Sequence, residues 1–284
     1  MTLANDLASA PGGDLRGFSG RLLLVGAGKM GSALLEGWLR LGLEAKNVDV
    51  LEPTPAPQIS SLASNGLRLN PQLRAPTALD VVVLAVKPQI AAEAIAPLVP
   101  IIGASTLVIS IMAGRTLQFL TSAIGRPCAL VRAMPNTPAA IGRGITVAVP
   151  LNASEKQRQL AHQLLSAAGA VEWIEDEILM DAVTAVSGSG PAYVFLLAEV
   201  LGQAGAAAGL PPALAQRLAR ETVAGAGELL HRSPLDAATL RENVTSPGGT
   251  TAAALTVLMG NSGLAPLMRE AVAAATARSR ELAG

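Results

Sequence analysis

Short apolar runs, each ending at a glycine or a polar turn, recur through the first 175 residues. They are typical of strands buried in a parallel sheet, and they predict strands at residues 22–25, 48–51, 81–86, 107–111, 129–132, 145–149 and 170–173. Between them, apolar residues at helical spacing predict helices at residues 32–41, 58–65, 91–98, 117–123 and 154–168. Because strands and helices alternate with short connections, we expect a mostly parallel sheet with helices on both faces.

From residue 176 onward the pattern is different, since Ala, Leu, Glu and Arg dominate and none of the runs has the character of a strand. We expect three segments: a flexible N-terminal leader at residues 1–20, an α/β domain at 21–175 and an all-helical domain at 176–284. Glycines such as Gly202 and Gly205 give the predicted helices small faces. Either ordinary close packing or a dimer of interleaved helices would use such faces.

Composition excludes several classes of function. Of the 284 residues, 50% are hydrophobic and 15% are charged, which suffices for a large core and excludes an intrinsically disordered chain. Lys and Arg together number 21, as do Asp and Glu, so no basic excess points to nucleic acid. Aromatic residues make up only 2%, which argues against a stacking platform for single strands. We therefore expect no nucleic-acid partner.

Metal and membrane sites are also disfavoured. Cys128 has no second cysteine with which to form a disulfide or a zinc site, and His162 and His231 are far from it in the sequence. This use of cysteine is typical of the reducing cytoplasm. The uncharged runs at 94–114 and 244–268 are long enough to span a membrane, but prolines and glycines interrupt both. We expect a cytoplasmic protein with no metal and no membrane contact.

The glycine-rich segment Gly26-x-Gly28-x-x-Gly31 lies between the first strand and the first helix. In this setting Gly26 allows a tight turn, Gly28 lets the backbone approach a pyrophosphate, and Gly31 lets the helix pack against the strand. Glu52 ends the second strand, about 20 residues beyond Gly31, where an acidic residue would bond a ribose 2′-hydroxyl. It would also repel a 2′-phosphate, which favours NADH over NADPH. The alternatives are a purely structural turn and an exposed glutamate at a strand end.

Three further segments follow predicted strands, which is where ligands bind in such sheets. Lys87, in the sequence Ala85-Val86-Lys87-Pro88, is equally compatible with a cofactor contact and with a solvated loop lysine. The small residues around Ala113 leave room for a nicotinamide or a ribose. Asn136 lies between two prolines, so a rigid loop could aim its amide at a ring, with a plain turn as the alternative.

Several motifs occur together in one order. After the glycine-rich segment come Ala85-Val86-Lys87-Pro88, Met134-Pro135-Asn136-Thr137-Pro138, Ser187-Gly188-Ser189-Gly190-Pro191-Ala192-Tyr193 and Val244-Thr245-Ser246-Pro247-Gly248-Gly249-Thr250-Thr251. From about Arg21 to the C-terminus the chain resembles the pyrroline-5-carboxylate reductases, the enzymes of the last step of proline synthesis. The last two motifs are specific to that family, whereas many dehydrogenases share the first.

The resemblance implies a reaction and an assembly. The reaction is reduction of the cyclic imine 1-pyrroline-5-carboxylate to L-proline with NADPH, NADH or both. The implied fold is a Rossmann-like dinucleotide-binding domain followed by an all-α domain that forms homodimers through interleaved helices. Such dimers often assemble further into rings, commonly decamers, and the partner's helical domain completes each active site.

The resemblance also implies which residues bind the ligands. For the cofactor they are Gly26, Ala27, Gly28, Lys29, Met30, Gly31, Ala85, Val86, Lys87, Pro88, Ile111, Met112, Ala113 and Asn243, to which the residue chemistry adds Glu52 and Asn136. For the substrate they are Glu177, Ser246, Gly248, Gly249, Thr250 and Thr251. Many relatives have a small polar residue near the position of Glu52 and use NADPH well. We therefore expect NADH to be at least competent here.

The chemistry of the residues agrees with these roles. Hydride transfer to an imine needs no enzymic nucleophile, because it needs only two carbons held close together. Exposed N–H groups at Gly248 and Gly249 form a site for a carboxylate, unless this segment is a plain helix–helix turn. The hydroxyl of Thr251 then needs only to orient and stabilise the ring nitrogen. Thr251 is therefore the expected catalytic residue.

Two other functions are open as alternatives. A 3-hydroxyacid dehydrogenase of the same architecture would place a catalytic lysine in the helical half, but no lysine follows Lys156. A protein that senses dinucleotides without turnover would be expected to degrade the loop from Ser246 to Thr251, which is intact here.

Overall fold

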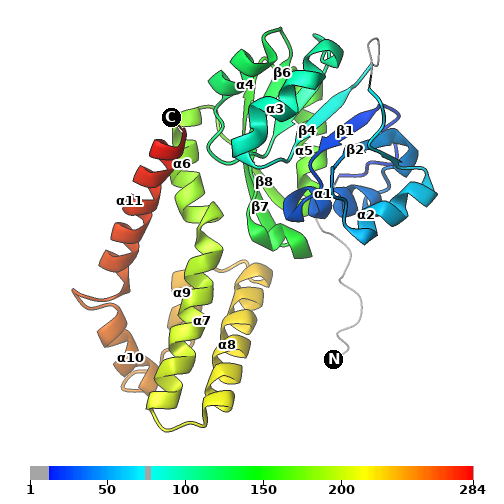
Figure 1. The fold of residues 1–284 in the computed structure, drawn as a ribbon. Helices are drawn as coiled ribbons and strands as arrows, with labels where there is room; N and C mark the ends of the chain where they lie inside the picture. The colour runs from blue at the N-terminus through cyan, green and yellow to red at the C-terminus, as the bar shows by residue number, and fades with distance from the viewer. Residues whose placement is uncertain (1–12, 74–77, 284) are drawn as a thin grey trace. The chain divides into compact units, whose positions relative to one another are not determined.

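An eight-stranded sheet organises the N-terminal part of the chain, in the order β3-β2-β1-β4-β5-β6-β7-β8 (Figure 1). The structure is a computed structural model that describes residues 13–73 and 78–283. Neighbouring strands are parallel except for β6 and β7. The strands are β1 Leu22–Val25, β2 Val48–Leu51, β3 Arg68–Leu69, β4 Val81–Leu84, β5 Leu107–Ser110, β6 Ala129–Met134, β7 Gly144–Leu151 and β8 Gly169–Trp173. Every predicted strand is present. Only β3 is not predicted from the sequence, because it is too short to show a periodic pattern.

The helices of this part also match the predicted positions. They are α1 Lys29–Arg40, α2 Pro57–Leu62, α3 Ala91–Ile95, α4 Leu117–Ile124 and α5 Glu155–Leu165. Short 3₁₀ turns join them: η1 Ala45–Asn47, η2 Ala63–Asn65, η3 Pro88–Ile90, η4 Ala96–Ile101, η5 Thr137–Ile141, η6 Ser166–Ala168 and η7 Glu177–Leu179. The single helix expected at 91–98 is divided into α3 and η4. Proline explains this division, because Pro97 and Pro100 supply no backbone N–H for an α-helical hydrogen bond.

Both faces of the sheet are buried, as the continuous apolar runs predict. Alternate residues of the central strands point to opposite faces, so Leu22 and Leu24 pack with α1 and α5, while Leu23 packs with α3 and α4. Trp38 Nε1 in α1 donates a hydrogen bond of 2.8 Å to the Leu164 carbonyl in α5, which ties these two helices together. Helices therefore cover both faces of the sheet.

The segment before β1 corrects one prediction. Residues 1–20 were expected to form a flexible leader, but Leu15 is only 2% exposed and its N–H donates to the Leu41 carbonyl at 3.0 Å. Phe18 also packs against the core. Because Leu15 and Phe18 pack against the core, the described residues 13–20 are part of the fold. The rest of the expected leader, residues 1–12, lies outside the described residues.

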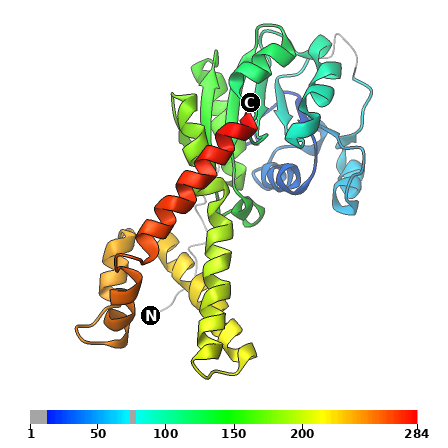
Figure 2. The same cartoon turned by 60° about the vertical axis from the view of Figure 1, so that its left-hand side comes forward.

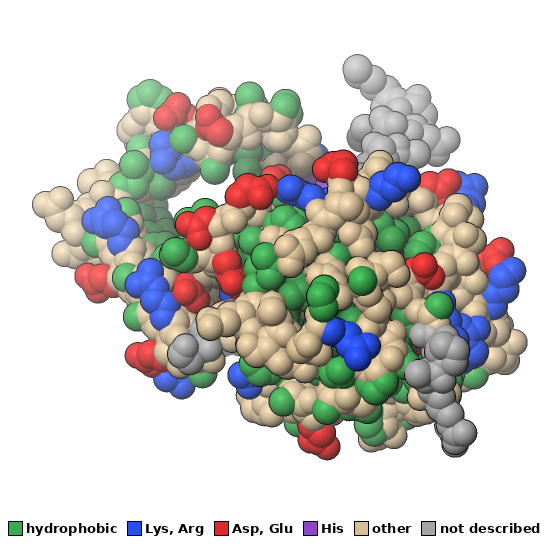
Figure 3. All heavy atoms as spheres, turned by 90° about the horizontal axis from the view of Figure 1, so that it is seen from above, with side chains coloured by type: hydrophobic (Ala, Val, Ile, Leu, Met, Phe, Trp, Pro, Cys, Tyr) green, Lys and Arg blue, Asp and Glu red, His purple; other side chains and the backbone are tan. Residues whose placement is uncertain are grey.

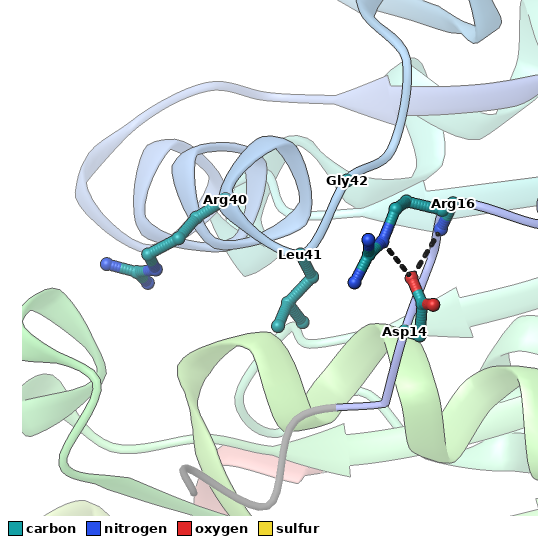
Figure 4. A pocket seen from close by; sticks show the side chains of 5 residues that line it. All are labelled: Asp14, Arg16, Arg40, Leu41 and Gly42. Carbon is teal, nitrogen blue, oxygen red and sulfur yellow. Dashed lines mark hydrogen bonds and ion pairs between the residues drawn. The ribbon is translucent and has the colours of Figure 1, made fainter. Parts of the chain in front are cut away.

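A shallow concavity lies beside the same segment, lined by Asp14, Arg16, Arg40, Leu41 and Gly42 (Figure 4). Asp14 Oδ1 accepts hydrogen bonds from the Arg16 backbone N–H and from Arg16 Nε, at 2.9 and 3.0 Å. These bonds to the carboxylate hold the pKa of Asp14 below its usual range. The concavity is at the far end of α1 from the glycine-rich turn, about 18 Å along the helix axis. It is therefore separate from the predicted cofactor site.

Asp49 forms a buried ion cluster on β2. Its side chain is fully buried, and its two oxygens accept from Arg21 Nε, at 2.6 Å, and from Arg68 Nε. Since a buried carboxylate needs charged partners, this cluster fixes the short strand β3 to the edge of the sheet.

Helices make up the rest of the chain, and the described residues from 175 onward contain no strand. They are α6 Met180–Val183, the π-helical turn η8 Thr184–Gly188, α7 Gly190–Ala207, α8 Pro212–Arg232, α9 Ala237–Asn243, α10 Thr250–Leu258 and α11 Leu264–Ala283. Helices α7 and α8 run side by side (Figure 1) and are joined by a short turn at their lower ends, which Figure 2 also shows. A Cβ at Gly202 would lie 3.3 Å from the Gln216 Cα, so this glycine permits the close approach of the two helices.

The chain divides into two compact units, one of Met1–Gly188 with Ala277–Gly284 and one of Ser189–Thr276. We call them the α/β unit and the helical unit. The end of α11 thus belongs to the α/β unit, where Ser279 Oγ donates to Asp181 Oδ1 at 2.7 Å. The units divide at Gly188, whereas the domain boundary expected at residue 175 stays a prediction.

Candidate active site

The glycine-rich turn has the geometry that its sequence predicts. Gly26 has a φ of +92°, a conformation that favours glycine, and a Cβ at Gly31 would lie 2.2 Å from the Gly26 carbonyl oxygen. Gly28 is the N-cap of α1 and offers no side-chain hydrogen bond to it. A Cβ at Gly28 would meet no atom within 4 Å, so open space lies in front of the helix. Free N–H groups beside open space fit the phosphates of a dinucleotide.

Glu52 reaches the same turn from the end of β2. Its Oε2 accepts a hydrogen bond of 2.8 Å from the Ala27 N–H, and its Oε1 accepts one of 3.0 Å from the Thr54 N–H. The carboxylate is therefore held at the mouth of the glycine-rich turn. Its expected contact with the ribose stays a prediction.

Asn70 holds Glu52 in place, and the sequence analysis missed it. Asn70 Oδ1 accepts from the Glu52 N–H at 2.8 Å, and Asn70 Nδ2 donates to the Glu52 carbonyl at 2.9 Å. Its φ of +48° is one that asparagine adopts more readily than most residues. The only signal in the sequence was the turn-forming pair Asn70-Pro71.

The ends of β4 and β5 lie beside this turn. A Cβ on Gly26 would be 2.8 Å from the Ala85 carbonyl oxygen, which shows how closely the segment after β4 approaches. The Ile111 N–H donates to the Leu84 carbonyl at 3.0 Å and joins the next segment to it. Ile111 and Met112 are buried, at 8% and 2% exposure, whereas Ala113 is exposed. A ligand would therefore meet the backbone here rather than the Met112 side chain.

Asn136 has a structural contact in the loop after β6. Its Oδ1 accepts a hydrogen bond of 3.0 Å from the Ile145 N–H, and so fixes this loop to the start of β7. Its assignment to the cofactor stays a prediction.

Glu177 also has structural partners. Its Oε1 accepts from the Leu117 N–H at the start of α4, at 2.8 Å, and from Arg132 Nη1, at 2.6 Å. Arg132 is only 5% exposed, so Glu177 neutralises a buried cation. These contacts account for Glu177 without a substrate, and its expected role toward the substrate stays a prediction.

The remaining predicted residues lie in the helical unit. Asn243 ends α9, and the turn from Ser246 to Gly249 leads into α10. Gly248 has a φ of +69°, and the Gly249 N–H donates to the Ser246 carbonyl at 3.1 Å. Gly249 is the N-cap of the nine-residue helix α10 and offers no capping side chain. The first N–H groups of α10 are thus available to an anion, and Thr251 is half-buried beside them.

The described part of the chain contains no group of three or more His, Cys, Asp and Glu side chains that could hold a metal ion. Cys128 is buried, and burial raises the pKa of its thiol. Acidic and basic side chains are interspersed over the face shown in Figure 3.

One helical stretch, Glu177–Ala207, is long and apolar enough to cross a membrane by length and composition. This stretch is different from the two uncharged runs at 94–114 and 244–268. Its apolar window is only 6% buried, and Phe195 within α7 is 68% exposed. An apolar helix that another protein chain covers passes the same test, so this stretch is weak evidence for a membrane span.

Comparisons with known proteins decide the family. Residues 177–282 match the family model described as pyrroline-5-carboxylate reductase dimerisation, and residues 21–114 match one described as NADP oxidoreductase, coenzyme F420-dependent. The pyrroline-5-carboxylate reductase of Pseudomonas aeruginosa is 39% identical, over 93% of this chain and 97% of its own length. This chain belongs to the pyrroline-5-carboxylate reductase family.

Other reductases support the same assignment. The one from Synechocystis is 42% identical, over 92% of this chain and 98% of its own length. The solved structure of the reductase from Coxiella burnetii has a TM-score of 0.86 at 32% identity, and covers 94% of this chain and 99% of its own. The reductase of Plasmodium falciparum, solved with NADP bound, has a TM-score of 0.74 at 29% identity, with coverage of 94% and 99%.

The enzyme therefore reduces 1-pyrroline-5-carboxylate to proline with NAD(P)H, in proline biosynthesis. Its N-terminal part is a Rossmann-like domain, and its helical half is a dimerisation domain. These findings confirm the predicted fold class, reaction and cofactor class. The dehydrogenase and sensor alternatives are set aside.

Proposed function

We propose that the dinucleotide of this reductase lies along the carboxyl edge of the sheet. The turn from Gly26 to Gly31 binds the pyrophosphate, and Glu52 meets the adenine ribose. The nicotinamide half follows the segments Ala85–Pro88 and 111–113. The observation that carries this placement is the bond between Glu52 Oε2 and the Ala27 N–H, because it puts the ribose-binding carboxylate at the phosphate-binding turn.

The substrate binds, in this proposal, at the start of α10. The N–H groups that follow Gly248 and Gly249 donate hydrogen bonds to its carboxylate, which the positive end of the helix also favours. The imine arrives protonated on its ring nitrogen, and the hydroxyl of Thr251 accepts a hydrogen bond from that N–H. Hydride addition at C5 then gives the neutral amine. When bound, NAD(P)H supplies the hydride. Asn243, in the same unit, contacts the cofactor.

A second copy of the chain completes each site. The exposed apolar side chains of α7, such as Phe195 and Leu196, support a homodimer in which helices of the two copies interleave. The partner copy then supplies the turn from Ser246 to Thr251. We further propose that such dimers assemble into decamers. These decamers lie in the cytoplasm and do not contact a membrane.

The test is steady-state reduction of pyrroline-5-carboxylate by the wild type and by Thr251→Ala. We expect kcat/KM for the imine to fall about 100-fold, because the ring nitrogen loses its hydrogen-bond partner. The dissociation constant of NADH should stay the same.

Thr256→Ala is the matched control. Thr256 is an exposed threonine of the same helix whose hydroxyl bonds only the Ala252 carbonyl, at 3.0 Å. Its loss should leave both constants unchanged. Equal losses of turnover and of cofactor affinity in Thr251→Ala would contradict the role of Thr251.

A further inference from the structure

One guanidinium joins two loops that leave neighbouring strands. Arg115, in the loop after β5, donates from Nε and Nη2 to the Pro88 carbonyl, at 2.9 and 2.6 Å. Pro88 belongs to the loop after β4 and begins η3. The same carbonyl accepts the Ala91 N–H that closes the first turn after η3. Arg115 is thus a bridge between two segments that we place along the cofactor.

The Arg115 side chain is itself held in position. Its guanidinium carbon lies 4.7 Å from the centre of the Phe119 ring, which favours one orientation of the planar group. Its backbone N–H donates to the Met112 carbonyl at 3.4 Å. A further bond, from the Leu117 N–H to Glu177, fixes the end of the same loop. Both ends of the bridge are therefore anchored before any ligand arrives.

We propose that Arg115 is a positioning residue for cofactor binding. It fixes the spacing between Lys87–Pro88 and Ala113, the two segments along which we place the nicotinamide half. Two loops held together in advance spare the enzyme the entropic cost of ordering them on binding. This inference rests on the proposed cofactor site, and it gives Arg115 no contact with the reacting atoms.

Arg126 provides a matched comparison within the same layer of the fold. Its Nη1 donates to the Ile102 carbonyl at 3.1 Å, so it too joins a segment next to α4 to the segment before it. However, Ile102 precedes β5 and Arg126 precedes β6. Both therefore lie at the amino ends of these strands, opposite the carboxyl ends where we place the cofactor. An arginine that merely stabilises the fold should behave alike at both positions.

The experiment compares Arg115→Met, Arg115→Lys and Arg126→Met. The readouts are the dissociation constants of NADH and NADPH by titration, kcat and KM with pyrroline-5-carboxylate, and the melting temperature. We expect Arg115→Met to weaken the binding of both dinucleotides about tenfold, with kcat within about twofold of the wild type. Arg115→Lys should recover part of this loss, because a lysine can make one hydrogen bond but not a fork. Arg126→Met should lower only the melting temperature.

Two results would overturn the inference. If Arg115→Met lowers the melting temperature and leaves both dissociation constants unchanged, Arg115 only stabilises the fold. If kcat collapses at unchanged affinity, Arg115 acts on the substrate instead.

Ala113→Trp separates these failures from a failure of the proposed site. A large side chain at this exposed position should block the nicotinamide half. Normal cofactor binding by Ala113→Trp would refute the proposed site itself. Blocked binding in Ala113→Trp together with normal binding in Arg115→Met would refute the role of Arg115 alone.

Discussion

The α/β unit and the helical unit treat their apolar side chains in opposite ways. In the central strands Leu22, Val81 and Leu107 are completely buried, whereas in α7 Phe195 is 68% exposed and Leu196 is 56% exposed. The described residues of α9 and α10 include no buried side chain at all. The first unit builds its own core from one chain. The helical unit has exposed apolar faces, and it gains stability when another protein surface covers them.

The largest effect is expected from a substitution that places a charge on the exposed face of α7. Phe195→Glu should prevent dimer formation, because burying an unpaired carboxylate in an apolar interface is costly. Activity should then fall more than about 1000-fold, because a monomer lacks the turn that, in the proposed dimer, the partner copy supplies to the cofactor site. Light scattering and turnover measure both effects.

A measurement of cofactor binding distinguishes loss of the dimer from misfolding of the whole protein. The Phe195→Glu protein should still bind NADH, because the α/β unit folds around its own core. Gln118→Glu, which adds a charge to the exposed face of α4, should change neither assembly nor turnover. If the Phe195→Glu protein stays dimeric, the exposed apolar face of α7 does not form the dimer interface.

A smaller effect is expected at Glu177, where sequence and structure suggest different roles. Glu177→Gln keeps an acceptor for the Leu117 N–H but leaves Arg132 without its counter-charge. We expect the free energy of unfolding to fall by about 2 kcal/mol, less than for a fully buried pair because the Glu177 side chain is 27% exposed. Denaturant titration measures the loss.

Glu175→Gln is the control for Glu177. Glu175 is 76% exposed and pairs with Arg158 at 2.7 Å, a contact that should contribute little. If instead Glu177→Gln keeps its stability and raises KM for the imine, Glu177 binds the substrate as the family resemblance implies.

The smallest effect concerns cofactor choice in the α/β unit. Glu52→Gln removes the negative charge that would repel a 2′-phosphate, while its amide oxygen can still accept from the Ala27 N–H. The ratio of kcat/KM for NADPH to that for NADH should rise about tenfold, which corresponds to about 1.4 kcal/mol. Glu44→Gln, at a surface pair with Lys46, should leave the ratio unchanged. No change in Glu52→Gln would mean that the carboxylate does not face the ribose.

Sequence patterns predicted local features well and long-range contacts poorly. The strands and the turn at Gly26 follow from neighbours in the chain, because apolar runs and glycine spacing determine them directly. The partners of Glu177 and Asn70 do not. Leu117 is 60 residues from Glu177 in sequence, and only the folded sheet brings them together. Leu15 likewise looked like part of a loose leader, since its place in the core depends on the end of α1.

The helical unit raises a different difficulty for prediction. Its apolar pattern indicated helices correctly, but amphipathic spacing cannot say whether a face meets the same chain or a second copy. The residues that we propose for catalysis and substrate binding in this unit therefore come from the family resemblance.

The path of the chain through the two units has a consequence for how the protein is made. The α/β unit is discontinuous, because the whole helical unit is inserted between Gly188 and Ala277. Ser279, which bonds Asp181 of α6, and Leu282, whose backbone lies near Gly114, leave the ribosome only after the helical unit has been synthesised. The sheet can form early, but α6 and the loop after β5 each gain one of these contacts late. The edge of the sheet at which we propose the cofactor binds is thus completed only after the dimerisation domain has been synthesised.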